Sequence, residues 1–204
     1  MKARRPLRQY LWVASSIYIA LGFVNILAAW LGLICFAAPL AVALVNRDKG
    51  YCNLYCGRGQ LFSLLGGRMR LSRQRETPRW LRSAAFRYGF LTFFLLMFAN
   101  MAWATWLVFA GAGSLRQAVT LFWTIRLPWQ WAHTATVVPP WVAQFAFGFY
   151  SLMLTSTLLG LIAMALYRPR SWCAFCPMGT MTQLLCRARN PELRAEPTTG
   201  AMPG

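Results

Sequence analysis

Two pairs of cysteines are the residues whose type and spacing could do chemistry in this sequence. The first pair is Cys52 and Cys56, and the second is Cys173 and Cys176. In both pairs an aromatic residue precedes each cysteine, a glycine follows the second cysteine by three positions, and a leucine pair follows it by eight and nine. This shared pattern predicts an internal duplication, with motifs over 51–66 and 172–186, that presents four thiols to one centre about a pseudo-twofold axis.

Four thiolates are the usual ligands of a [4Fe–4S] cluster, and Cys followed by Pro, as in Cys176-Pro177, recurs in iron–sulfur motifs. Gly59 and Gly179 would let backbone N–H groups approach an anionic centre. Zinc also accepts four cysteines at such spacings, so spacing alone leaves zinc open, and [2Fe–2S] remains a further alternative. We expect a [4Fe–4S] cluster in preference to either. The predicted ligands are Cys52, Cys56, Cys173 and Cys176.

The other two cysteines and the single histidine are interpreted separately. Cys35 lies inside an apolar run, where a free cysteine is commonly a small packing residue. Cys186 aligns with Gly66 of the other motif, so we favour a structural role for it over that of a substitute ligand. His133 cannot by itself provide two-histidine ligation of a haem, and an interfacial polar role is the simpler interpretation.

The composition places these motifs in a helical membrane protein. Of 204 residues, 58% are hydrophobic and 12% are charged, whereas a soluble domain has about 25% charged residues. The uncharged run Tyr10–Val45 would be about 54 Å long as one helix, too long for a ~30 Å hydrocarbon core. We therefore predict a turn near Ala28–Gly32, with one long tilted helix as the rival. The expected fold is one all-α membrane domain over 1–204. Its four spans are predicted at approximately 10–28, 32–46, 86–112 and 142–167.

The distribution of basic residues predicts the orientation of the chain. Lys and Arg number 21 against four acidic residues, a net charge of +17. All but Arg116 and Arg126 lie in the N-terminus, in 46–87 or in the C-terminal tail. The positive-inside rule places these three segments in the cytoplasm, with both termini there and an even number of spans. Because the basic residues cluster between apolar runs, this interpretation is favoured over nucleic-acid binding. The Trp-rich segment 113–141 is expected at the membrane interface on the side opposite the cytoplasm.

The cysteine motifs beside membrane spans resemble those of the NapH/NosR-like membrane iron–sulfur proteins, of polyferredoxin type, which carry two C-x3-C-P motifs. Cys52 and Cys56 match the first motif, with Gly57 in place of Pro. Cys173, Cys176 and Pro177 match the second, with one residue fewer between the cysteines. For the core membrane domain, the resemblance implies electron transfer between a quinone or cytoplasmic donor and a partner redox protein. It also implies a hetero-oligomeric complex in the cytoplasmic membrane of a bacterium.

Positive charge beside a cluster favours its reduced state and should raise its potential. Arg58 and Arg170 are close to the ligands in sequence, so we expect them, together with Gly59 and Gly179, to tune the cluster. Among polar residues in or near the spans, Asn25, Asn100 and Gln144 could bind a quinone, although helix packing is the favoured role. No catalytic residue is predicted.

The sequence therefore predicts an electron-transfer subunit of an oxidoreductase complex in preference to a stand-alone enzyme. Membrane lipid and one or more redox subunits are the expected partners. Two alternatives stay open. One is a structural or assembly subunit with a four-cysteine metal clip, and the other is a quinone-linked thiol oxidoreductase.

Overall fold

The computed structural model describes residues 10–46, 55–122, 124–129 and 138–189, and this part of the chain is mostly helical. Three helical segments are long and apolar enough to cross a membrane, namely Ile26–Val45, Ala84–Phe109 and Pro140–Leu166. A fourth apolar helix, Leu11–Val24, is shorter. At 1.5 Å per residue its 14 residues extend for about 21 Å, less than a ~30 Å hydrocarbon core.

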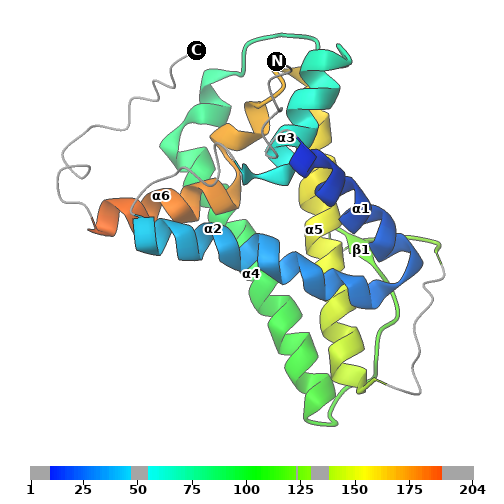
Figure 1. Ribbon diagram of the computed structural model, residues 1–204. Helices are drawn as coiled ribbons and strands as arrows, with labels where there is room; N and C mark the ends of the chain where they lie inside the picture. The colour runs from blue at the N-terminus through cyan, green and yellow to red at the C-terminus, as the bar shows by residue number, and fades with distance from the viewer. Residues whose placement is uncertain (1–9, 47–54, 123, 130–137, 190–204) are drawn as a thin grey trace, which may run out of the picture.

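The long apolar run at the N-terminus folds as a hairpin. Helix α1 (Leu11–Val24) ends at Asn25, a 3₁₀ helix η2 (Ile26–Leu31) follows, and α2 (Gly32–Asn46) runs away at a sharp angle (Figure 1). The structure therefore has the turn and not the single long helix. The turn begins at Asn25, earlier than the predicted Ala28–Gly32, because the Asn25 side chain accepts a hydrogen bond from the Leu27 N–H at 3.0 Å and caps the 3₁₀ helix.

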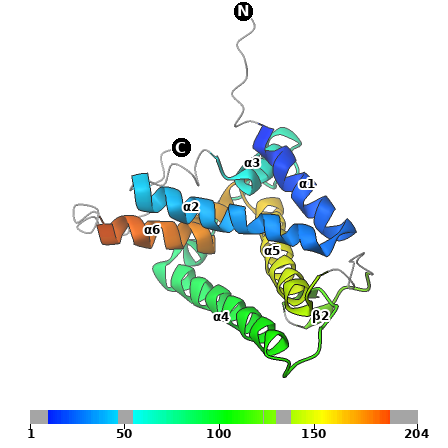
Figure 2. The ribbon, with the colours of Figure 1, turned by 60° about the horizontal axis from the view of Figure 1, so that its bottom comes forward.

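Helices α4 (Ala84–Phe109) and α5 (Pro140–Leu166) lie side by side in both ribbon views (Figures 1 and 2). They correspond to the predicted spans 86–112 and 142–167, although α4 ends at Phe109 and α5 ends at Leu166. Helix α4 begins where the Ser83 hydroxyl accepts a hydrogen bond from the Phe86 N–H at 3.2 Å, and α5 begins with Pro140. In the most apolar stretch of α5, 67% of residues are buried, against 22% for α4. Helix α5 is therefore the central helix of the fold.

Small residues of α5 allow its neighbours to pack closely. A Cβ at Gly160 would overlap the Phe62 ring, and a Cβ at Gly148 would overlap the Met101 side chain. Phe62 lies on α3 (Gly57–Ser63), which also packs against α1 and runs into a π-helical turn, η4 (Leu64–Arg68). Close approach at small residues is typical of helix packing in membranes. It attaches the first cysteine motif to α5.

The described residues between α4 and α5 pack in part against α5. Its two short strands, β1 (Thr120–Leu121) and β2 (Ile125–Arg126), pair antiparallel, which is a small exception to the all-α prediction. The Thr120 N–H donates to the Ser151 hydroxyl at 3.0 Å, and the Arg116 N–H donates to the Gln144 side-chain carbonyl at 2.9 Å. The buried amide of Gln144 is therefore used in packing.

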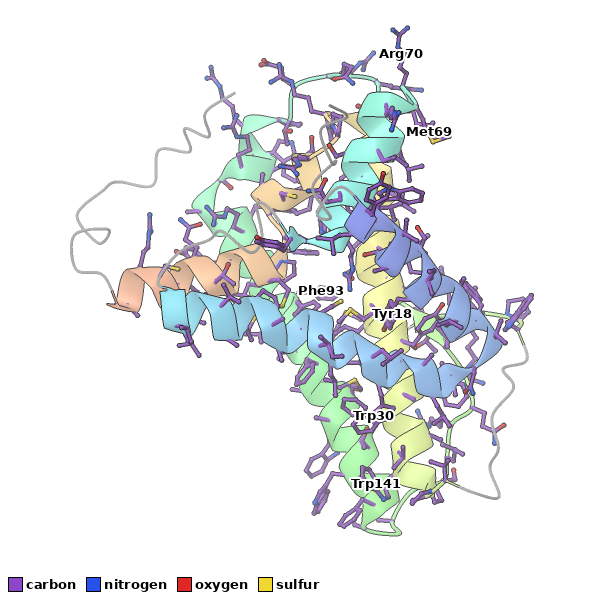
Figure 3. The ribbon with its side chains drawn as sticks, in the orientation of Figure 1. Tyr18, Trp30, Met69, Arg70, Phe93 and Trp141 are labelled. Atoms are coloured by element: carbon purple, nitrogen blue, oxygen red, sulfur yellow. The ribbon has the colours of Figure 1, made fainter. Side chains whose placement is uncertain are left out.

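The chain on either side of the second motif completes the architecture. A 3₁₀ turn, η5 (Arg79–Arg82), precedes α4; another, η6 (Ser171–Ala174), follows α5 and leads into α6 (Pro177–Arg189). Helices α6 and α2 lie side by side; α2 crosses the α4–α5 pair, and α6 contacts α4 (Figures 1 and 2). Figure 3 places Met69 and Arg70 near one end of α5 and Trp141 at its other end.

The contact between Gly160 and Phe62 can be tested by adding one methyl group. Gly160→Ala should displace the Phe62 ring and destabilise the fold by about 1–3 kcal/mol, measured as a lower thermal midpoint in detergent. Gly89→Ala on α4 is the matched control, because its Cβ would meet nothing within 4 Å. Phe62→Leu should partly restore the stability of the Gly160→Ala protein. An unchanged midpoint for Gly160→Ala alone would contradict this packing.

Candidate metal centre

Three of the four predicted ligands line one cavity. Cys56 is far in the sequence from Cys173 and Cys176, yet all three contribute to the wall of a space of about 180 Å³. The cavity lies among α2, α3, α4 and α6 and reaches Met153 and Ser156 in the middle of α5. The fourth predicted ligand, Cys52, lies outside the described residues.

Gly59 shows how closely the two motifs approach one another. A Cβ built on Gly59 would stand 3.8 Å from the sulfur of Cys56 and 3.9 Å from the sulfur of Cys173. A Cβ on Gly179 would stand 3.9 Å from the Cβ of Cys176 and 3.7 Å from the carbonyl oxygen of Cys173. Each of the two glycines in the repeat pattern thus leaves open a space that borders cysteines of the site.

The two motifs adopt the same local structure around their second cysteine. Cys56 directly precedes α3 and Cys176 directly precedes α6. Each cysteine carbonyl accepts a hydrogen bond at 3.0 Å from the N–H four residues later, Gln60 for Cys56 and Thr180 for Cys176. A shared turn from cysteine into helix is what a duplicated segment would retain.

Cys176 is protonated at neutral pH in the metal-free chain. Burial raises the pKa of its thiol to about 11, although its sulfur accepts hydrogen bonds from the backbone N–H groups of Gly179 and Met178, which lower the pKa. A metal that binds Cys176 must therefore displace a proton. The same two N–H groups then stabilise the thiolate, because a charged acceptor strengthens a hydrogen bond.

The residues present fit an iron–sulfur cluster. The donor set consists of thiols, and Gly59 and Gly179 leave space beside them. Within the described ranges, no three His, Cys, Asp or Glu side chains are close enough together to hold a single metal ion. Cys56, Cys173 and Cys176 therefore share a volume rather than converge on one point.

The two arginines predicted to tune the site are placed differently. Arg58 lines the cavity, and its guanidinium donates to the Ser156 hydroxyl at 2.8 Å and also contacts the sulfur of Met153. Arg170 is exposed and is not part of the cavity wall. Its backbone carbonyl accepts the Cys173 N–H at 3.0 Å, so Arg170 shapes the turn that carries Cys173.

Two cavity residues were not predicted from the sequence. Cys35 on α2 lines the same cavity as the motif cysteines, although we interpreted it as a packing residue. Arg87, in the first turn of α4, lines it as well. Arg87 could have been found from its position at the start of an apolar run, because a charged residue there is costly and commonly functional. For Cys35 no signal in the sequence indicated the cavity.

The remaining candidates lie elsewhere. Cys186 is 2% exposed and is not part of the cavity wall. That position is compatible with the structural role that we favoured. His133 falls outside the described residues.

Comparison with known proteins agrees with this chemistry. A family model described as a 4Fe-4S binding domain matches residues 28–76 and 150–194, which together make up less than half of the chain. Each matched segment contains one cysteine motif and the helix after it; the first also contains α2, and the second contains the part of α5 from residue 150 onward. No curated protein and no solved structure matches the chain. The family match supports an iron–sulfur protein with a [4Fe–4S] cluster as its cofactor.

The placement of the two arginines leads to a prediction about the midpoint potential. Arg58→Gln removes a positive charge from the cavity wall and should lower the potential by roughly 60 mV, a tenfold change in the one-electron equilibrium. Arg170→Gln, an equal charge change on an exposed side chain, should lower it far less because solvent screens that charge. Redox titration followed by EPR measures both. Equal shifts for the two variants would contradict the difference in placement.

The space beside Gly59 provides a second prediction. Gly59→Ala places a methyl group between the sulfurs of Cys56 and Cys173 at ordinary contact distances, so the metal-free fold should survive. The cluster affinity should fall by about tenfold, seen as fewer irons per chain after reconstitution. Gly67→Ala is the control, since its Cβ would meet a single atom, of Pro169, at 3.9 Å. Full iron content in Gly59→Ala would show that this space is not used.

Proposed function

We propose that this chain is an electron-transfer subunit of a membrane oxidoreductase complex. One [4Fe–4S] cluster would be held by Cys52, Cys56, Cys173 and Cys176. Its electrons would pass between a quinone or cytoplasmic donor and a partner redox protein. The observation that carries this proposal is that thiols from both motifs line a single cavity, within two segments that match a 4Fe-4S binding domain.

A bound [4Fe–4S] cluster supplies one-electron transfer at a potential set by its surroundings. The residues of this chain provide those surroundings. Phe36, Phe94 and Trp172 are apolar parts of the cavity wall and limit the access of water. Arg58 places a positive charge in the wall, where exclusion of water strengthens its effect. The N–H groups of Met178 and Gly179 stabilise the Cys176 thiolate.

The proposed membrane position rests on the three long apolar helices and on the charge distribution. Arg70 and Trp141 lie near opposite ends of α5 (Figure 3), which agrees with a basic cytoplasmic side and an aromatic interface across the membrane. We propose a multi-pass protein of the bacterial cytoplasmic membrane with both termini in the cytoplasm. In this arrangement α1 would be the short fourth span.

Two arguments favour a subunit over an isolated carrier. One cluster would be held by Cys52, Cys56, Cys173 and Cys176. A hydrocarbon core of ~30 Å is too thick for electrons to cross through a single cluster. The cavity wall includes Met153 and Ser156, which are buried in the middle of α5, so electrons would have to enter or leave through a partner placed beside the site. A quinone and a partner redox subunit of the NapH/NosR type fit these requirements.

The deciding experiment measures iron, acid-labile sulfide and zinc in protein purified in detergent without oxygen. EPR spectra before and after dithionite then test whether a bound cluster is reduced. We expect about four irons per chain and a new signal on reduction. Zinc would favour the structural clip, and a protein without metal would favour the thiol oxidoreductase; either result would overturn the proposal.

Serine variants identify the ligands. Cys56→Ser, Cys173→Ser and Cys176→Ser should each lose most of the iron and the EPR signal, because serine is a poor substitute for thiolate. Cys186→Ser is the matched control and should retain both, since Cys186 is buried away from the cavity. The assignment would be wrong if the three motif variants kept the wild-type iron content.

A further inference from the structure

Arg87 is the charged residue of the cavity wall whose hydrogen bonds are incomplete. It lies in the first turn of α4, and its Nη2 donates to the side-chain carbonyl of Gln183 on α6. Its Nε is buried and has no hydrogen-bond partner, the one such side-chain nitrogen or oxygen in the described part of the chain. A buried donor on a charged group is costly to leave unpaired, so its position calls for an acceptor.

An acidic side chain does not supply that acceptor among the described residues. The sequence has four carboxylates, of which Asp48, Glu192 and Glu196 lie outside the described ranges. The fourth, Glu76, is 84% exposed and forms a surface ion pair with Arg168 at 3.1 Å. Arg58 and Arg87 therefore place two positive charges around one cavity whose described anionic candidates are cysteine thiolates. A buried charge is costly unless it is paired or fully hydrogen-bonded.

We propose that Arg87 binds the anionic cluster, with its Nε–H as the donor and Gln183 as the residue that holds its guanidinium in place. This inference rests on the proposed iron–sulfur function. Four thiolates around an oxidised [4Fe–4S] core carry a net charge of about −2, and reduction makes it about −3. Arg87 thus stabilises the reduced form more than the oxidised form. It is the charged residue that α4, which carries no cysteine, contributes to the described site.

Arg87→Met and Arg87→Lys separate the hydrogen bond from the charge. Methionine is of similar length and has neither a donor nor a charge, whereas lysine keeps the charge but lacks the forked guanidinium. Arg82→Gln is the control, because Arg82 is exposed and lies five residues before Arg87. The readouts are iron content, the midpoint potential from EPR-monitored titration, and the melting temperature of the metal-free protein.

We expect Arg87→Met to shift the one-electron equilibrium at least tenfold toward the oxidised form, or about 59 mV. Arg87→Lys should give a smaller shift in the same direction, and Arg82→Gln should titrate like wild type. Loss of iron from Arg87→Met, with a shifted potential in Arg87→Lys, would equally support binding by Arg87.

If the wild-type protein contains the cluster but both Arg87 variants have the wild-type potential, this inference would be overturned and the proposed function would stand. The same holds for variants that lower the melting temperature of the metal-free protein without moving the potential, since this would indicate a purely structural role. Wild-type protein without iron would overturn the proposed function and this inference together.

Discussion

The fold is organised around an unbalanced charge in a largely apolar interior. Arg58 reaches the middle of α5, and Arg87 enters the same cavity from α4. The one carboxylate of the described residues, Glu76, is paired at the surface. An anion bound in this cavity would be stabilised by both guanidinium groups. The cysteines can provide that anion when metal replaces their protons, so cofactor binding and folding of this region are expected to be coupled.

Helix α5 makes this arrangement possible because its sequence allows close packing and also satisfies the hydrogen bonds of its buried hydroxyl groups. Gly148 and Gly160 allow Met101 and Phe62 to pack closely, so α4 and α3 can lie against it. Its buried hydroxyl groups bond within the helix; Ser151 and Thr155, for example, donate to the carbonyls of Phe147 and Ser151. A helix that is apolar, closely packed and internally satisfied can be buried in the protein while its neighbours face lipid.

The sequence predicts the local features of the site well, because they depend on neighbouring residues. The turn from cysteine into helix recurs at Cys56 and Cys176, as the repeat pattern suggests. The features that it does not predict depend on contacts between distant segments. Cys35 and Arg87 reach the cavity only because α2 crosses the α4–α5 pair, and no spacing rule encodes that crossing. The early turn at Asn25 was missed for a local reason, since a side-chain cap competed with an unbroken apolar pattern.

The two halves of the proposed duplication have taken different positions in the fold. Helices α2 and α5 each precede a cysteine motif, yet in the apolar window of α2, with η2, 28% of residues are buried against 67% in α5. Helix α2 contains Pro39, which has no N–H to donate to the carbonyl of Cys35 one turn earlier, and both residues line the cavity. The site therefore has a peripheral, proline-containing helix on one side and a closely packed central helix on the other, although each precedes a cysteine motif.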